Sequence, residues 1–165
     1  MKPRVFIASS SESIEIAEAT LYNLEFVAEV TPWSQGIFNI SKTSLESLLS
    51  AIPTFDFGIF VFSPDDIIQI KGETKKVPRD NVIFELGLFI GYLGKERCFI
   101  VTPRDIESLH LPTDLLGYQP TTYDSKRSDK NWKAALTYAC IDIKDAIKKL
   151  GKRKDSISIV NYDSL

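Results

Sequence analysis

Apolar residues along the chain follow two different spacings. Nearly unbroken apolar runs at residues 4–9, 57–62 and 97–102 have the length of strands that are covered on both faces. Between the runs, apolar residues recur every three or four positions, which predicts helices with one buried face. The predicted strands are 4–9, 26–31, 57–62, 97–102 and a weaker 119–123, and the predicted helices are 14–24, a short helix capped by Thr43 or Ser44 with Leu45, Leu48, Leu49 and Ile52 on one face, 81–93, and 132–150.

This alternation predicts an α/β fold with a central five-stranded parallel sheet and helices on both faces. In such sheets a ligand binds beyond the carboxyl ends of the strands, near the point where the strand order reverses. The rule directs attention to the loops that follow Ser9, Thr31, Phe62 and Thr102.

The length of 165 residues suits one domain. We assign residues 1–150 to it, because Gly151 is a natural cap for the last helix. Residues 151–165, basic and then polar, are interpreted as a linker or disordered tail. Residues 63–78 are polar, contain proline and glycine, and are predicted to form a long loop.

Composition excludes several classes of partner. The net charge is -2 with no basic segment before the tail, so nucleic-acid binding has no electrostatic support. The longest apolar stretch, residues 82–93, is too short to span a bilayer, and residues 5–8 are too short for a signal peptide. We therefore expect a cytoplasmic protein without a membrane partner.

Two cysteines and one histidine provide too few ligands for a metal site. Cys98 lies in an apolar strand and Cys140 on a helical face, so buried free thiols are expected. With only His110 beside them, a zinc site is not expected, and we assign no metal. Asp65 and Asp66 after the third strand are compatible with a metal, but a solvated loop is the favoured interpretation.

One carboxylate stands out. Residues 82–93 read V-I-F-E-L-G-L-F-I-G-Y-L, so Glu85 is placed in a helix that is apolar nearly all round. Burial of an unpaired carboxylate is costly. Asp80 or Asn81 is the expected N-cap, and the helix dipole would lower the pKa of Glu85 while burial would raise it, so the sequence leaves the direction open.

Structural explanations exist for the unusual residues of this helix. The alternative to a functional role for Glu85 is a structural salt bridge with Arg79 or Arg97. Close packing of the helix on the sheet is the simple explanation for Gly87, Gly91 and Gly94, each of which weakens a helix by about 1 kcal/mol relative to alanine.

Familiar catalytic motifs are missing. Residues 7–11 read I-A-S-S-S, so neither a G-x-G-x-x-G fingerprint nor the acidic residues of a receiver domain follow the first strand. The sequence has no P-loop, and no nucleophile elbow accompanies His110.

Several blocks do resemble a known family, the TIR-like domains of bacterial anti-phage effectors, including TIR–STING proteins of CBASS defence and Pycsar TIR proteins. The blocks are V-F-I-A-S-S-S-E at 5–12, W-S-Q-G-I-F at 33–38, F-D-F at 55–57, S-P-D-D at 63–66, R-D-N-V-I-F-E-L-G-L-F-I-G at 79–91 and L-P-T-D-L-L-G at 111–117. The resemblance covers residues 2–123.

The resemblance implies a flavodoxin-like TIR fold and hydrolysis of NAD to nicotinamide and an ADP-ribose product. Glu85 matches the catalytic glutamate of the family and Asp114 its second pocket acid. The loop at residues 33–38 resembles the loop that gates the pocket and assembles TIR domains into oligomers or filaments. NAD is then the substrate, and no cofactor is expected.

The resemblance also implies a partner domain. In the family the TIR domain is usually fused to a sensor of a cyclic nucleotide, and the order here resembles that of TIR–STING. Residues 151–165 would then lead to a sensor of a cyclic dinucleotide. Oligomerisation after sensing would then activate the enzyme.

The candidate substrate-binding residues are Phe6, Ser9, Ser10, Trp33, Phe38, Arg79, Asp80 and Asp114. The two serines are placed to bind ribose or phosphate oxygens. The three aromatic residues are candidates to pack on the nicotinamide ring, with a purely structural core role as the alternative for Phe6. Arg79 would pair with phosphate or with Glu85. Asp114 would orient the ribose or the carboxamide, or merely cap its loop.

A single carboxylate suits this chemistry. Glycosidases generally use two carboxylates, one of which protonates the leaving group. Nicotinamide in NAD is already a cation and leaves as a neutral molecule without a proton. What remains is stabilisation of the positive charge that develops on the ribose, and a partly desolvated carboxylate provides it.

Two other functions remain open. A nucleoside deoxyribosyltransferase-like enzyme has a similar sheet and a glutamate in an F-E-L-G context, as at residues 84–87. A TIR module that only assembles with partners is the second alternative, although an adaptor has no need for the buried charge of Glu85.

Overall fold

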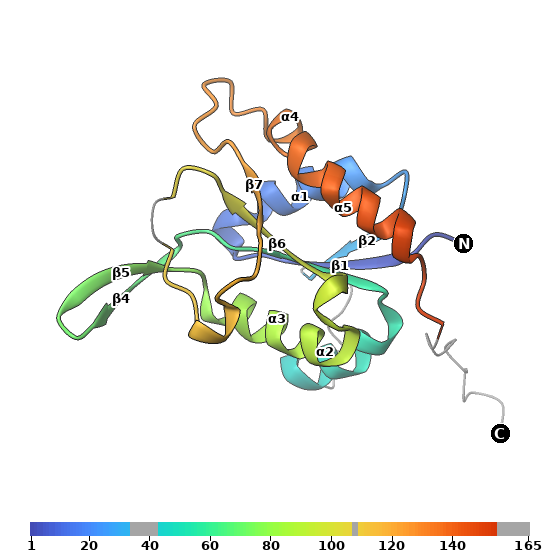
Figure 1. The fold of residues 1–165 in the computed structure, drawn as a ribbon, viewed down its shortest axis with the longest axis horizontal. Coiled ribbons are helices and arrows are strands. Elements are labelled where there is room, and N and C mark those ends of the chain that lie inside the picture. The colour runs from blue at the N-terminus through green and yellow to red at the C-terminus, as the bar shows by residue number, and fades with distance from the viewer. Residues whose placement is uncertain (34–42, 107–108, 155–165) are drawn as a thin grey trace.

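A parallel sheet forms the centre of the molecule, as predicted (Figure 1). The computed structural model describes residues 1–33, 43–106 and 109–154. The strands of this sheet are β1 (Arg4–Ala8), β2 (Glu29–Pro32), β3 (Phe57–Val61), β6 (Cys98–Pro103) and β7 (Thr121–Tyr123). They lie in the order β2-β1-β3-β6-β7, and every neighbouring pair is parallel. The predicted flavodoxin-like TIR architecture is confirmed.

Helices cover both faces of the sheet (Figure 1). One face carries α1 (Ile14–Leu24), α4 (Trp132–Ala135) and α5 (Thr137–Leu150), and the other carries α2 (Ser44–Ala51) and α3 (Asp80–Leu93). Short 3-10 turns are η1 (Ser11–Ser13), η2 (Ile52–Thr54), η3 (Lys95–Arg97) and η4 (Thr113–Leu115). The chain thus has three layers, with the sheet shielded on both sides.

Alternation along the strands divides the core in two. Val5 and Ile7 of β1 face α1 and α5, whereas Phe6 and Ala8 face α3. β3 repeats this division and is completely buried along its whole length. Both faces of the central strands are therefore apolar, which explains the unbroken runs in the sequence.

Residues 63–78 contain a feature that the sequence analysis missed. The predicted loop is wrong in its centre, where β4 (Asp66–Ile70) and β5 (Glu73–Val77) form an antiparallel hairpin. Lys71 and Gly72 make its two-residue turn with φ of 51° and 81°, the left-handed conformations that match the twist of a hairpin. The hairpin extends away from the body of the domain (Figure 1).

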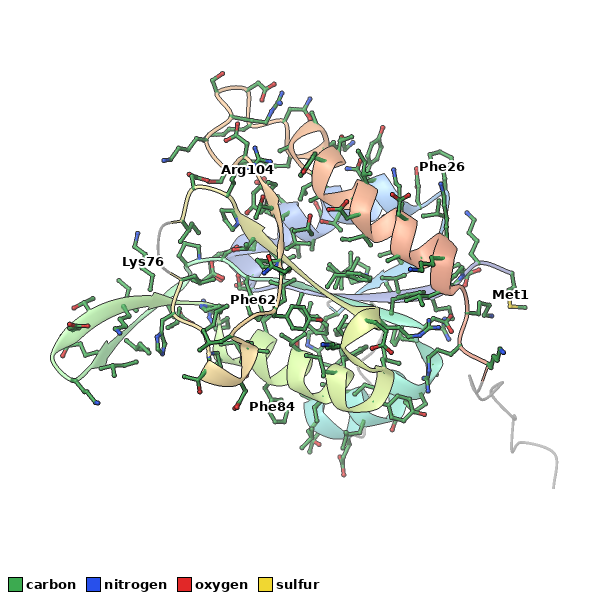
Figure 2. All side chains as sticks on the ribbon, viewed as in Figure 1. Met1, Phe26, Phe62, Lys76, Phe84 and Arg104 are labelled. Atoms are coloured by element: carbon green, nitrogen blue, oxygen red, sulfur yellow. The ribbon has the colours of Figure 1, made fainter. Side chains whose placement is uncertain are left out.

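Smaller differences follow from turn geometry and packing. The second strand begins at Glu29 rather than residue 26, because Ala28 still donates to the carbonyl of Leu24 at the end of α1. Phe26 is consequently exposed and points away from the core (Figure 2). The predicted helix 132–150 is divided at Leu136, which is fully buried with φ −88° and ψ −4°.

The caps and the short second helix were predicted with partial success. Thr43 forms a capping box with Glu46 at the start of α2, as expected. Leu48 is buried on its inner face, but Leu45 and Leu49 are exposed, so the predicted apolar face is only half used.

The close-packing explanation for the glycines of α3 is wrong. A Cβ at Gly87 or Gly91 would meet no atom within 4 Å, because both residues are on the outer face of the helix. Gly94 ends the helix with φ 87°, a conformation that favours glycine. The close approach occurs instead at Gly58 of β3, where a Cβ would lie 2.9 Å from the Phe89 ring of α3.

The residues that follow α5 stay attached to the amino edge of the sheet. The buried carboxylate of Asp56 accepts the backbone N–H groups of Arg4 at 2.9 Å and Arg153 at 2.8 Å. The Arg97 guanidinium donates to the carbonyl of Gly151 at 2.9 Å. Domain contacts thus continue past residue 150.

The expected buried thiols are confirmed, since Cys98 and Cys140 are free and buried. Burial raises the pKa of each thiol to about 12. None of the helices in the described part of the chain is long and apolar enough to cross a membrane.

Candidate functional site

The strand order reverses between β1 and β3, and polar side chains meet beyond their carboxyl ends. The chain leaves β1 toward β2 on one side and leaves β3 toward β6 on the other. Ser10, directly after β1, donates its hydroxyl to Asp65 at 2.7 Å. Ser13 donates to the hydroxyl of Ser63 at 2.8 Å in a buried pair. The two loops are thereby held together at the place where this fold class binds ligands.

Arg79 connects the same two loops to the start of α3. It is the N-cap residue of that helix, and its Nε donates to Asp66 at 2.7 Å while Nη2 donates to Glu12 at 3.0 Å. All three side chains are partly exposed, so their ion pairs contribute little stability. Their effect is to orient the loops around the N-terminus of α3.

Glu85 lies in the second turn of α3 on the face that packs against the sheet. Only 6% of its surface is exposed, and Val82, Leu86 and Phe89 beside it belong to the apolar cluster under α3. Its Oε2 atom is buried and has no hydrogen-bond partner among the described residues. Burial raises the pKa of Glu85 to about 7, which decides the direction that the sequence left open.

The salt-bridge alternative for Glu85 is wrong. Arg79 is engaged by Glu12 and Asp66. Arg97 donates to backbone carbonyls and lies over the ring of Phe57 at 4.8 Å. Glu85 is therefore a desolvated carboxylate without a cation from either candidate, an arrangement that proteins bear chiefly at functional sites.

Aromatic rings from β1, α3 and the end of β2 pack together beside the site. Phe6 is completely buried and stacks on Phe89 with ring centroids 4.5 Å apart. Trp33, half-buried at the end of β2, meets the Phe6 ring edge-on at 5.8 Å. Phe6 thus has the core role given as its alternative, while Trp33 retains surface for a ligand. Phe38 lies outside the described residues.

The remaining candidates are separated in space. Ser9 is half-buried beside Ser10 at the end of β1. Asp80 is exposed at the first position of α3, where its carboxylate accepts the N–H of Asn81. Asp114 is exposed in a surface cleft with Lys95 and Glu96, which follow the C-terminal end of α3. The structure therefore brings the serines and Arg79 together, and places Asp114 beside the opposite end of the helix that carries Glu85.

The sequence analysis gave no binding role to Glu12, Ser13 or Ser63, and it considered Asp65 and Asp66 only as metal ligands and favoured a solvated loop. These five residues build the polar network. Their position directly after β1 and β3 was the available signal, because the carboxyl ends of neighbouring parallel strands meet at one edge. Asp65 and Asp66 are occupied by Ser10 and Arg79. No group of three or more potential metal ligands occurs within the described ranges.

The comparison with known proteins agrees with this geometry. The family model described as CAP12/Pycsar effector protein, TIR domain, matches residues 4–125, which contain the crevice between β1 and β3 and all of α3. The chain belongs to this TIR domain family. The predicted resemblance is thereby confirmed, and the TIR domain extends from the first strand to the last strand of the sheet.

Individual relatives support the assignment. The chain is 43% identical over 150 residues to the Pycsar effector protein PaPycTIR of Pseudomonas aeruginosa, covering 90% of this chain and 48% of that protein. It is 37% identical over 157 residues to the CD-NTase-associated protein 12 of Lachnospiraceae bacterium strain RUG226, covering 94% and 47%. The CD-NTase-associated protein 12 of Flavobacterium daejeonense is 36% identical over 167 residues, covering 98% and 53%. The chain spans about half the length of these relatives.

Proposed function

We propose that this TIR domain hydrolyses NAD at the bond between nicotinamide and ribose, as an effector in anti-phage defence. The observation that carries the proposal is the buried carboxylate of Glu85, which has a pKa of about 7 and an Oε2 atom without a partner in the described structure. Burial of an unpaired carboxylate lowers the free energy of unfolding, so folding by itself gives no reason for this group. The names of the related Pycsar effectors support the defence role.

The proposed reaction needs one protein carboxylate. As the bond between C1′ and the nicotinamide nitrogen breaks, its electron pair moves to the nitrogen and neutralises the ring. Ionised Glu85 stabilises the positive charge that develops on the ribose, and the apolar surroundings strengthen this interaction. Water then bonds to C1′, and one of its protons is released to the carboxylate. The products are ADP-ribose and nicotinamide.

Roles for the neighbouring residues follow from their contacts. Ser9 and Ser10 at the end of β1 are proposed to bind ribose or phosphate oxygens, and Trp33 to contact the nicotinamide ring. Arg79 donates through Nε and Nη2 to Asp66 and Glu12, which leaves Nη1 for a phosphate oxygen. Asp114 stays proposed as the second acid of the site. For this role the loop at η4 would have to bring Asp114 into contact with the substrate.

Activation is proposed to require self-association, triggered by a sensor domain that binds a cyclic nucleotide. The twofold length of the Pycsar and CD-NTase-associated relatives supports a further domain. Exposed apolar side chains support self-association: Phe84 of α3 is 55% exposed and points away from the body of the domain (Figure 2). A clustered protein is therefore the form to assay.

The test is nicotinamide release from NAD by the clustered wild-type protein and by Glu85→Gln. We expect the wild type to release nicotinamide and the variant to lose activity on the order of 10²–10³-fold, with an unchanged circular dichroism spectrum. Deoxynucleosides are assayed in parallel, and cleavage of these with NAD left intact would establish the deoxyribosyltransferase-like alternative. If neither substrate is cleaved and Glu85→Gln changes only assembly, the adaptor function is correct.

A further inference from the structure

A large cleft opens on the same edge of the sheet as the polar network. It has a volume of about 1010 Å³, at the upper end of the range for pockets that bind small molecules and cofactors. Its lining comes from β5, from the loop after β6 and from the loop after β7, and includes Glu73, Lys75, Lys76, Asp105 and Lys126. Both loops follow carboxyl ends of parallel strands, the ligand-binding edge of this fold class.

The walls of the cleft are tied together by the backbone. Lys76 of β5 bridges to Leu109, and the N–H of His110 donates to the carbonyl of Lys76 at 2.8 Å. The hairpin that the sequence analysis missed therefore forms one wall of the cleft, and backbone contacts hold it against the opposite wall. Figure 2 shows Lys76 at the base of this hairpin, on the side of the loop after β6.

Three lysine residues and two acidic residues are among those that line the cleft. Lys75 lies 3.6 Å from Glu73 and Lys126 lies 3.3 Å from Asp105, in pairs that are open to solvent. Exposed pairs of this kind are weak, so either lysine can turn to a stronger anion at small cost. Lys76 has no ion pair among the described residues. These cations are suited to a phosphate or diphosphate group.

The cleft adjoins the helix that carries Glu85. Leu109 and Leu111 line the cleft and also pack against the apolar cluster that contains Val82 and Leu86. These two residues flank Glu85 in sequence and share its buried face of α3. Leu109 and Leu111 therefore belong both to the wall of the cleft and to the side chains that pack on the apolar cluster under α3.

We propose that this cleft binds the diphosphate-bearing half of a dinucleotide, with Lys76 and Lys126 as further partners of the phosphate oxygens in addition to Arg79. The identity of the ligand as NAD rests on the proposed function, whereas phosphate binding by the cleft does not. Glu85 acts at the nicotinamide ribose, and the cleft holds the part of the substrate that does not react. Such remote contacts determine affinity for the whole dinucleotide.

The test separates binding from turnover. ADP-ribose is titrated by calorimetry into Glu85→Gln protein alone and with Lys76→Gln or Lys126→Gln added. We expect each lysine change to weaken ADP-ribose binding about tenfold, since each removes a charged hydrogen bond. Lys148→Gln replaces another exposed lysine, on α5 at the other face of the sheet; it is the matched control and should bind as the parent does.

A kinetic arm uses nicotinamide riboside, which carries the scissile bond but no phosphate. In active protein, Lys76→Gln should raise the KM for NAD and leave cleavage of nicotinamide riboside unchanged. Unaltered ADP-ribose affinity in both lysine variants would overturn the cleft proposal, even if NAD is cleaved. Conversely, weakened ADP-ribose binding in protein that leaves NAD intact would support the cleft while contradicting the proposed reaction.

Discussion

Glu85 shows what can be inferred for one residue before a structure is known. Its apolar neighbours at positions 82–84 and 86–90 predict burial directly, and burial is confirmed. The sequence did not predict the direction of its pKa shift, nor that neither Arg79 nor Arg97 pairs with it. They depend on where two arginine side chains from other segments find their acceptors, which only the tertiary structure determines.

The raised pKa of Glu85 predicts a pH-dependent cost to stability. Below pH 4.5 the carboxyl is protonated in both the folded and unfolded states, so its burial does not lower the free energy of unfolding through ionisation. As the pH rises to about 7 the unfolded chain loses the proton first, and the free energy of unfolding falls by about 3 kcal/mol. Above pH 7 the cost stays constant.

Glu85→Gln should remove this cost. Urea denaturation at about pH 8 and about pH 4.5 measures it: the variant should be more stable than the wild type at the higher pH, and the difference should shrink toward zero at the lower one. Equal stability of the two proteins at both pH values would show that the carboxylate is not desolvated.

Elements were predictable where a periodic pattern existed. The strands covered on both faces are continuous apolar runs, and α3 and α5 are long enough to show helical spacing or a capping glycine. The β4–β5 hairpin projects from the domain, so most of its side chains are exposed and no apolar period marks it. The turn after α1 likewise depends on backbone hydrogen bonds, which leave no signal in the hydrophobic pattern.

Glycine substitutions test how α3 packs. Gly87→Ala should raise the free energy of unfolding by up to about 1 kcal/mol, because its outer position leaves room for a methyl group and alanine favours the helix. Gly58→Ala should lower it by about 1–3 kcal/mol, because the methyl group would collide with Phe89 and Phe60. Thermal unfolding of the two single variants measures both effects, and destabilisation by Gly87→Ala would contradict the packing described for α3.

At the scale of the whole molecule, strand–helix alternation was sufficient to predict one parallel sheet with helices on both faces. The same rule directed attention to the carboxyl ends of the strands, and Ser10 and Arg79, both candidate residues, lie in the polar network there. The network of Glu12, Asp65 and Asp66 was missed because its members come from separate segments that only the sheet order brings together. The cleft at the hairpin was missed because the hairpin itself was not predicted.

The pH dependence of NAD cleavage tests most directly whether the desolvated carboxylate of Glu85 performs the reaction. Nicotinamide release by the clustered protein is measured from about pH 5 to about pH 9. We predict that kcat/KM rises with pH through about 7, the pKa of Glu85 in the free protein. The kcat profile should rise at lower pH, because the bound nicotinamide cation favours the ionised carboxylate. Activity that is independent of pH across this range, or that survives in Glu85→Gln, would contradict the account.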